Sequence, residues 1–293
     1  MELSLRLATL LLSAGALGLA QSSTAAAKPA QASAPAPKLS YEEQERFLAT
    51  AAIVSRKVLD SGTTASERAT LSDGRITHDA HLQFIDIYRP VFRGKDGTVE
   101  KNFRDSYKFN IAAYRLAKML GIAGMVPVSV ERQIDAKIGS ATWWVDNIWM
   151  TEAERRDKQI KPPPTQEWSD QLNIVRVFDQ LIHNTDRNQG NLLITPEWKL
   201  WLIDHTRAFR TSTTLLKPEN LIRCDYRLLN AMRNLKAPDV TRELGAYLRA
   251  EEISGLMARR DLIVQFFDRE VAAKGESAVL TGMPRKTPNV SVP

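Results

Sequence analysis

Three oxygen-bearing side chains that suit metal and phosphate chemistry lie close together in the sequence. The segment HNTDRNQGNLLI, residues 183–194, contains Asp186 and Asn191, and Asp204 ends an apolar run in LIDHTRAF, residues 202–209. Phosphoryl transfer needs divalent metal ions that bridge the phosphates and a carboxylate that orients the attacking hydroxyl. Asp186 is the candidate for that carboxylate. Asn191 and Asp204 are candidate ligands for Mg²⁺ or Mn²⁺, which prefer oxygen donors.

Histidines and an arginine beside this cluster leave other chemistries open. His183 and His205 flank the acidic residues, and together with those carboxylates they form an alternative zinc site. The same donors would suit a metal-dependent phosphoester hydrolase. Two histidines on different elements more often orient a loop through hydrogen bonds. Asp186 and Arg187 can likewise form a structural ion pair at a helix end.

A predicted helix and a predicted hairpin must position the cluster. Apolar residues recur at spacings of three and four over residues 168–182, which predicts a buried helix whose C-terminal end carries residues 183–191. Residues 192–204 alternate around a Pro-Glu turn and predict a short hairpin. The segments from there to about residue 280 are predicted as amphipathic helices, and the pair Arg259-Arg260 is interpreted as a solvated face of one of them.

The first half of the chain predicts one helix followed by a β-hairpin. The pattern Ser40-x-x-Glu43 is typical of a capping box and predicts a helix over residues 41–60. Asp73-Gly74, between stretches of Thr, Leu, Ile, Phe and Tyr, predicts a β-hairpin whose second strand reaches Ile87.

A second helix is predicted after a polar loop at residues 93–104. Asp105 or Ser106 is expected to cap this helix, which ends at Leu120 before a glycine. The segments VPVSVER and ATWWVDNIWM then predict two more strands. The first half is therefore expected to be mostly sheet with one main internal helix.

Composition divides the chain into five predicted parts. The apolar run after a weakly charged start is typical of a signal peptide, with a membrane anchor as the alternative, and the Ala, Pro, Ser and Gln stretch behind it is typical of a flexible spacer. Three consecutive prolines in KPPP mark the change to mostly helical sequence. The predicted parts are a signal peptide at 1–20, a spacer at 21–39, a β-rich N-lobe at 41–152, a helical C-lobe at 153–280 and a tail at 281–293.

Charge and cysteine content narrow the class of protein. The 293 residues carry a net charge of +6 without a block of like charges, so the sequence predicts no nucleic-acid partner and a modest attraction for anionic ligands such as nucleotides. The only cysteine, Cys224, cannot form an internal disulfide. We expect an exported protein of the bacterial periplasm or the extracellular space, with no stable membrane span in the mature chain.

The order of these motifs resembles a known superfamily. The chain is similar to protein-kinase-like proteins in the order of their catalytic and metal-binding segments. That order is a helix, Asp-Arg-Asn-x-x-Asn, a short hairpin and an apolar-apolar-Asp run. The similarity is strongest to the atypical branch of the phosphatidylinositol 3/4-kinases and the secreted Golgi-type kinases. The matching residues are Asp186, Arg187, Asn191, Ile203, Asp204, Ala208 and Phe209.

The resemblance implies an α+β, two-lobed protein-kinase-like fold. It also implies ATP or another nucleoside triphosphate as co-substrate, with Arg187 among the residues that bind it. The chain departs from the family at Gln83 and Asn110, which stand where the phosphate-binding Lys and its Glu partner are expected. An amide pair can hold strand and helix in register, but it brings no positive charge to the phosphates. Alternative sources of that charge are Lys101, Arg104 and Lys108, and SGTT at 61–64 is a weak candidate for a phosphate loop.

Two main hypotheses follow from the sequence. The first is an exported bacterial atypical kinase that transfers a phosphoryl group to an unknown acceptor, with Gln83 and Asn110 lining the nucleotide side. The second is a pseudokinase that binds a nucleotide, a metal or a protein partner without turnover, which the Gln83 and Asn110 substitutions favour. The phosphoester hydrolase is a third interpretation.

Overall fold

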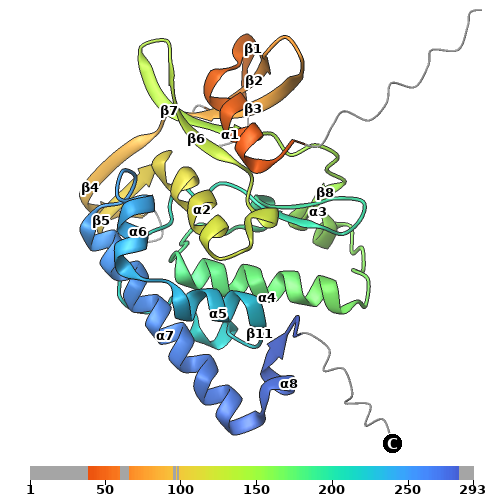
Figure 1. Ribbon diagram of the computed structural model, residues 1–293, viewed down its shortest axis with the longest axis vertical. Coiled ribbons are helices and arrows are strands. Elements are labelled where there is room, and N and C mark those ends of the chain that lie inside the picture. The colour runs from red at the N-terminus through yellow and green to blue at the C-terminus, as the bar shows by residue number, and fades with distance from the viewer. Residues whose placement is uncertain (1–38, 60–65, 95–96, 98, 284–293) are drawn as a thin grey trace, which may run out of the picture. The chain divides into compact units, whose positions relative to one another are not determined.

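A five-stranded antiparallel sheet organises the N-terminal region (Figure 1). The computed structural model describes residues 39–59, 66–94, 97 and 99–283. The predicted signal peptide, the SGTT segment and most of the predicted spacer and tail lie outside these residues. Neighbouring strands follow the order β1, β2, β3, β7, β6. Their bounds are β1 Ala52–Val58, β2 Glu67–Ser72, β3 Thr77–Gln83, β6 Ser129–Ile134 and β7 Lys137–Trp143.

The first helix is shorter than the sequence predicts. Helix α1 spans Tyr41–Thr50 and has the predicted capping box, in which the Glu43 N–H donates to the Ser40 hydroxyl (3.2 Å) and the Ser40 N–H donates to the Glu43 carboxylate (2.7 Å). The predicted helix over 41–60 is wrong in its second half, because Ala52–Val58 form β1. The β-branched residues of this segment suit a strand, and antiparallel pairing with β2 overrides the helical spacing.

The predicted Asp73-Gly74 hairpin is confirmed, but its second strand is shorter than predicted: β3 ends at Gln83, and Ile87 belongs to the next strand, β4 (Asp86–Arg93). Strands β2 and β3 pair in antiparallel register from Glu67↔Leu82 to Ser72↔Thr77. The Asp73 carboxylate accepts from the backbone N–H groups of Arg75 and Ile76, both at 2.9 Å, which fixes the turn.

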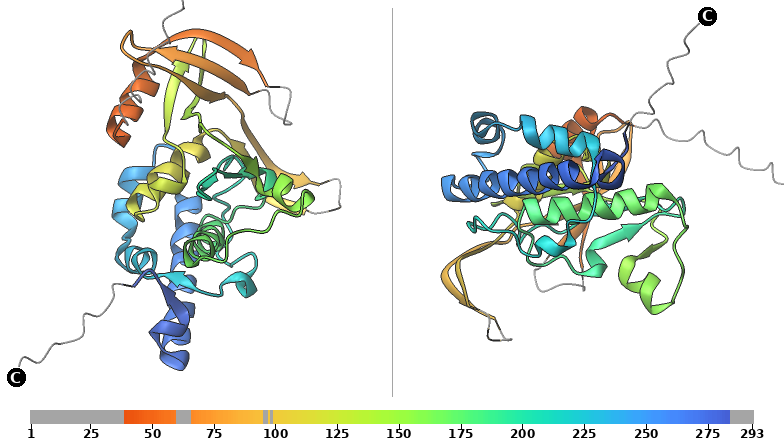
Figure 2. Two further views of the ribbon diagram at one scale, coloured as in Figure 1. Left: turned by 90° about the vertical axis from the view of Figure 1, so that its right-hand side faces the viewer. Right: turned by 90° about the horizontal axis from the view of Figure 1, so that it is seen from below.

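Residues 86–93 and 99–106 form a separate two-stranded ribbon, so the predicted loop at 93–104 is wrong from Val99 onward. Strand β4 (Asp86–Arg93) pairs with β5 (Val99–Ser106), and Figure 2 shows this ribbon projecting from the sheet region. Strand β4 and the first half of β5 are largely exposed on both faces, whereas residues 103–106 of β5 are buried. A strand exposed on both faces lacks the apolar alternation that predicts a half-buried strand.

Helix α2 (Lys108–Met119) is the main internal helix of the N-terminal region. It begins within two residues of the predicted start and ends one residue before the predicted end, and it packs against β6 and β7. Gly121 follows with φ of +74°, a left-handed conformation that glycine adopts without strain. A short turn, η1 (Ala123–Met125), leads into β6.

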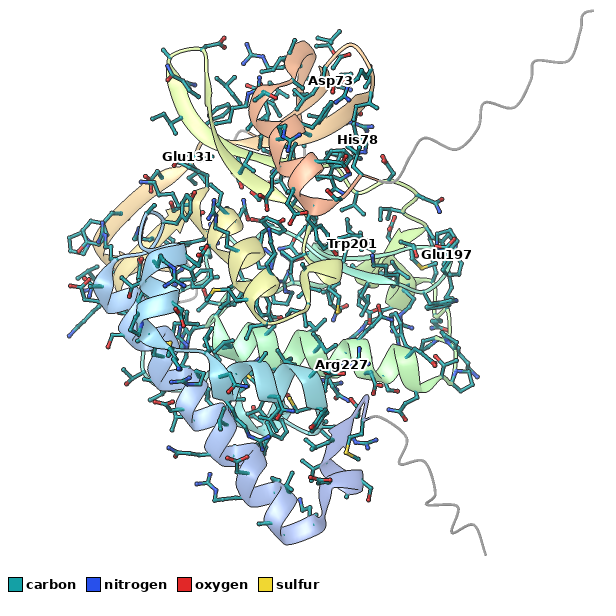
Figure 3. All side chains as sticks on the ribbon, viewed as in Figure 1. Asp73, His78, Glu131, Glu197, Trp201 and Arg227 are labelled. Atoms are coloured by element: carbon teal, nitrogen blue, oxygen red, sulfur yellow. The ribbon has the colours of Figure 1, made fainter. Side chains whose placement is uncertain are left out.

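The C-terminal region is mostly helical, so the predicted α+β class is confirmed. Helix α4 (Gln166–Leu181) precedes the candidate cluster, and strands β9 (Leu192–Ile194) and β10 (Leu200–Leu202) form the predicted hairpin, whose residues Glu197 and Trp201 are labelled in Figure 3. The other elements are β8 Met150–Thr151, α3 Glu152–Asp157, η2 Gln189–Asn191, η3 Pro218–Asn220, β11 Cys224–Asp225, α5 Tyr226–Asn234, α6 Ala237–Leu244, α7 Ala250–Lys274, α8 Glu276–Val279 and β12 Leu280–Thr281. In the part of the chain that the structure describes, no helix is long and apolar enough to cross a membrane.

Arg259 of α7 is fully buried, so its interpretation as part of a solvated helix face is wrong. Its Nε donates to Leu181 O (2.8 Å), and its Nη1 donates to Arg210 O (2.9 Å) and to Ser212 O. Burial lowers the pKa of Arg259 to about 10. Since this value is still well above neutral pH, the guanidinium stays charged. Arg259 therefore joins α7 to the end of α4 and to residues 205–212, the segment that follows Asp204 in the sequence.

Candidate functional site

A cavity of about 1010 Å³ collects most of the predicted site residues. Its lining includes Gln83 of β3, Asn110 of α2, Asp186 and Asn191 of the loop after α4, and Asp204 after β10. Residues from the sheet region and from the helical region thus face one space. Pockets of this size hold small-molecule ligands such as nucleotides.

Arg187 is the one predicted site residue that does not line this cavity. Its Nε donates to both carboxylate oxygens of Asp179 on α4 (3.1 and 3.2 Å), and its Nη1 donates to Asn191 O (3.1 Å) and Ile203 O (2.7 Å). These contacts fasten the loop to the helix before it and to the hairpin after it. The geometry therefore gives Arg187 a part in holding the loop, and its predicted contact with a nucleotide stays a prediction.

Asp186 is half-buried and presents its carboxylate at the cavity. The Nη1 atom of Arg207 lies 3.5 Å from Asp186 Oδ2, and the Asp186 N–H donates to Asn184 Oδ1 (3.1 Å). Burial raises the pKa of Asp186, and the nearby carboxylates of Asp204 and Asp105 add to this rise, while Arg207 opposes it. A carboxylate with a raised pKa is a better proton acceptor once it is ionised.

Asn191 and Asp204 are held in place by the backbone between them. The Ile203 N–H donates to Asn191 O (3.1 Å), and the Asn191 side-chain amide donates to Asp186 O (3.4 Å). Asp204 has φ of +53°, and its carboxylate accepts from the Thr206 hydroxyl at 3.2 Å. Strained backbone of this kind gathers at functional sites.

This donor set fits Mg²⁺ or Mn²⁺ only when phosphate completes the coordination. Across residues 39–283, as far as they are described, no three His, Cys, Asp or Glu side chains are arranged to hold a metal ion. A carboxylate from Asp204 and an amide oxygen from Asn191 suit a hard cation that keeps waters and phosphate oxygens.

Neither histidine of the alternative zinc site is arranged for that role. His183 does not line the cavity, and burial, with the charge of Arg259, lowers its pKa to about 4. Burial also lowers the pKa of His205 well below its ordinary value, and its ring packs edge-on against Phe178. Both rings are therefore neutral at neutral pH.

Gln83 and Asn110 form the predicted amide pair. The Asn110 side-chain amide donates to Gln83 Oε1 at 2.7 Å, and both side chains are buried. Asn110 Oδ1 also accepts from the backbone N–H of His205 at 2.8 Å. The pair thus links β3, α2 and the segment behind Asp204 without a charged group.

The three alternative cations of the N-terminal region do not line the cavity. Arg104 donates from Nη1 to both carboxylate oxygens of Glu252 (2.8 and 2.7 Å), and Lys108 Nζ lies 3.4 Å from Asp86 Oδ2. Lys101 lies on the exposed part of β5.

Asp105 and Arg207 line the cavity near Asp186, and neither is a predicted catalytic, cofactor-binding or metal-binding residue. Asp105, at the end of β5, is 3% exposed, and Arg207 Nε donates to its Oδ2 at 2.8 Å. The predicted cap at Asp105 or Ser106 is wrong, because Tyr107 is the N-cap of α2 and makes no side-chain cap bond; the Ser106 hydroxyl accepts from the Lys108 N–H (3.3 Å). No sequence spacing connects Asp105 with Arg207, because 102 positions separate them.

Comparisons with known proteins identify the fold. No sequence family and no curated protein matches the chain. The structure of hydra Fam20 with sugar is similar with a TM-score of 0.64 and 15% identity, over 82% of this chain and 92% of that chain. The Golgi casein kinase is similar with a TM-score of 0.59 and 13% identity, over 82% of this chain and 77% of that chain.

A second structure of the Golgi casein kinase, with Mn/ADP bound, is similar with a TM-score of 0.59 and 13% identity, over 85% of this chain and 80% of that chain. At these identities the likeness concerns the fold alone. The two-region architecture, with its antiparallel sheet and its helical region, agrees with it. The chain has an atypical kinase-like fold.

Proposed function

We propose that this protein is an exported atypical kinase that transfers a phosphoryl group from a nucleoside triphosphate to an acceptor hydroxyl, with Mg²⁺ or Mn²⁺. The observation that carries the proposal is the shared cavity, which brings Asp186, Asn191 and Asp204 together. The Mn/ADP bound to the Golgi casein kinase supports the choice of nucleotide and metal. Export rests on the predicted signal peptide at residues 1–20.

The roles of the residues follow from their positions. Asp204 and Asn191 would hold the metal ion, which when bound supplies positive charge to the phosphate oxygens. Asp186 would orient the acceptor hydroxyl and take its proton as the acceptor oxygen bonds to the terminal phosphorus and the nucleoside diphosphate leaves. Gln83 and Asn110 would line the nucleotide side and hold β3 against α2. Arg187 would keep the loop in the geometry that this step needs.

A pseudokinase is the second candidate, and the Gln83–Asn110 pair favours it. The pair leaves β3 without a positive charge for the phosphates. Such a protein would bind a nucleotide, a metal or a protein partner and would not turn over. Nucleotide binding without transfer of labelled phosphate would favour this candidate over the kinase.

Thermal unfolding of the mature protein, residues 21–293, tests the proposed ligand. ATP, GTP and ADP are each titrated with and without Mg²⁺ or Mn²⁺, because a ligand that binds only the folded state raises the unfolding midpoint. We expect a metal-dependent rise that the variant Asp204→Ala loses. Asp146→Ala is the matched control, since Asp146 lines the same cavity but pairs with His78 (2.6 Å) and should leave the metal dependence intact. No rise with any nucleotide would overturn the proposal.

A further inference from the structure

Positive charge is scarce in a cavity that is proposed to hold a triphosphate. Four carboxylates line it, those of Asp105, Asp146, Asp186 and Asp204. Among the described residues, two arginines and no lysine line it, namely Arg68 and Arg207. Uncompensated carboxylates repel phosphate groups, and one divalent metal ion neutralises only part of this charge. A second cation near Asp186 and Asp204 would reduce this repulsion.

Arg68 is engaged with other groups. Its Nε donates to Asp79 Oδ2 at 2.7 Å, and its guanidinium lies 4.3 Å from the centre of the Trp144 ring. These contacts are with β3 and with the residue that follows β7. Arg68 thus belongs to the sheet side of the cavity.

Arg207 lies among the acidic residues instead. Its Nε is fixed by Asp105 at 2.8 Å, and its Nη1 lies 3.5 Å from Asp186 Oδ2, which is longer than a good hydrogen bond. One third of the side chain is exposed. The Nη groups carry most of the N–H donors of a guanidinium, in a fork that matches phosphate oxygens.

We infer that Arg207 is the phosphate-binding cation of this site and takes over the part that an amide at position 83 cannot play. The inference rests on the proposed function. Arg207 comes three positions after Asp204, so one segment would supply both a metal ligand and a phosphate contact. With Arg207 drawn onto the phosphate, the Asp186 carboxylate is released to receive the acceptor hydroxyl.

Asp105 is the positioning residue for Arg207. It is 3% exposed, and its second oxygen, Oδ1, is buried without a hydrogen-bond partner among the described residues. A buried carboxylate with one cationic partner holds that partner tightly, because separation would leave the charge uncompensated. Burial alone would lower the pKa of Arg207, but Asp105, Asp186 and Asp204 together raise it, so the guanidinium stays charged.

The test compares ligands that differ only in their phosphates. Dissociation constants of adenosine, ADP and ATP are measured with Mg²⁺ for the wild type, Arg207→Gln and Arg68→Gln. We expect Arg207→Gln to weaken ATP binding by about ten- to a hundredfold, as for a lost hydrogen bond to a charged group, with adenosine unchanged. Arg68→Gln is the matched control, since it removes another aspartate-paired arginine of the cavity and should keep the wild-type ratio of ATP to adenosine affinity.

Two further variants separate phosphate binding from folding. Arg207→Lys keeps the charge but loses the fork, so we expect an intermediate loss of ATP affinity. Asp105→Ala keeps Arg207 but releases it, so ATP affinity should again fall more than adenosine affinity. Folded Arg207 variants with the wild-type ratio of ATP to adenosine affinity would overturn this inference and leave the proposed function standing. A wild type that binds none of the three ligands would overturn the proposed function and the inference together.

Discussion

The side-chain amide of Asn110 donates a hydrogen bond of 2.7 Å to Gln83 Oε1 where α2 meets β3. Asn110 also accepts from the His205 N–H, so a neutral pair connects three segments that line the cavity. Burying neutral amides that are hydrogen-bonded costs less than burying charges. The pair connects strand and helix without an ion pair.

The two positions should show strong energetic coupling. Gln83→Lys and Asn110→Glu each place an unpaired charge in the interior, so we expect each to lower the free energy of unfolding by about 3–5 kcal/mol. The double variant should recover roughly 1–3 kcal/mol of the summed loss as the new ion pair forms. Chemical denaturation of the four proteins measures this coupling. Strictly additive losses would mean that the two side chains do not contact each other in solution.

Arg187→Gln should destabilise the protein through Asp179. The substitution leaves a buried carboxylate without its cation and removes the contacts to Asn191 O and Ile203 O. We expect a loss of about 3–5 kcal/mol in the free energy of unfolding. Adding Asp179→Asn to this variant should restore part of the stability. If Arg187→Gln unfolds like the wild type but loses nucleotide affinity, Arg187 binds the nucleotide and does not hold the loop.

Asp186→Asn should separate binding from transfer. The amide has nearly the same shape as the carboxylate but cannot accept the acceptor proton, so we expect transfer of labelled phosphate to fall by roughly 10²–10⁴-fold. Affinity for ATP with Mg²⁺ should stay within a few fold of the wild type. The measurement pairs a transfer assay with a binding titration on the same protein. Undiminished transfer in this variant would remove Asp186 from the mechanism.

Stability should fall in mild acid because of His183. Its pKa is lowered to about 4 in the folded state, from an ordinary value of 6.5, so the unfolded chain takes up the proton first as the pH falls. Keeping this ring neutral stabilises the folded state fully at a pH above the ordinary pKa of 6.5. This stabilisation is lost as the pH falls toward the pKa of about 4 in the folded state. The free energy of unfolding, measured from about pH 7 to about pH 5, should decrease less steeply for His183→Gln than for the wild type. Equal slopes would contradict the lowered pKa.

The sequence predicts the local part of the site better than its long-range part. Asp186, Asn191 and Asp204 lie on one helix end and one short hairpin, so their spacing already implies their proximity. The Gln83–Asn110 contact was also predictable, because the family order of strand and helix pairs those positions. Asp105 and Arg207 meet only through the folded chain, which no periodicity records. The β4–β5 ribbon was missed because β4 and the first half of β5 are exposed on both faces and lack the apolar alternation of a half-buried strand.

The burial of Arg259 has a consequence for the motions of the segment behind Asp204. The carbonyls of Arg210 and Ser212 are bound to a guanidinium from which water is excluded, and so is the carbonyl of Leu181 at the end of α4. These residues can separate from α7 only when that helix itself moves. In hydrogen-exchange terms, backbone amides of residues 205–212 should exchange in the same rare opening events as those of α7. The segment then behaves as a rigid floor of the cavity.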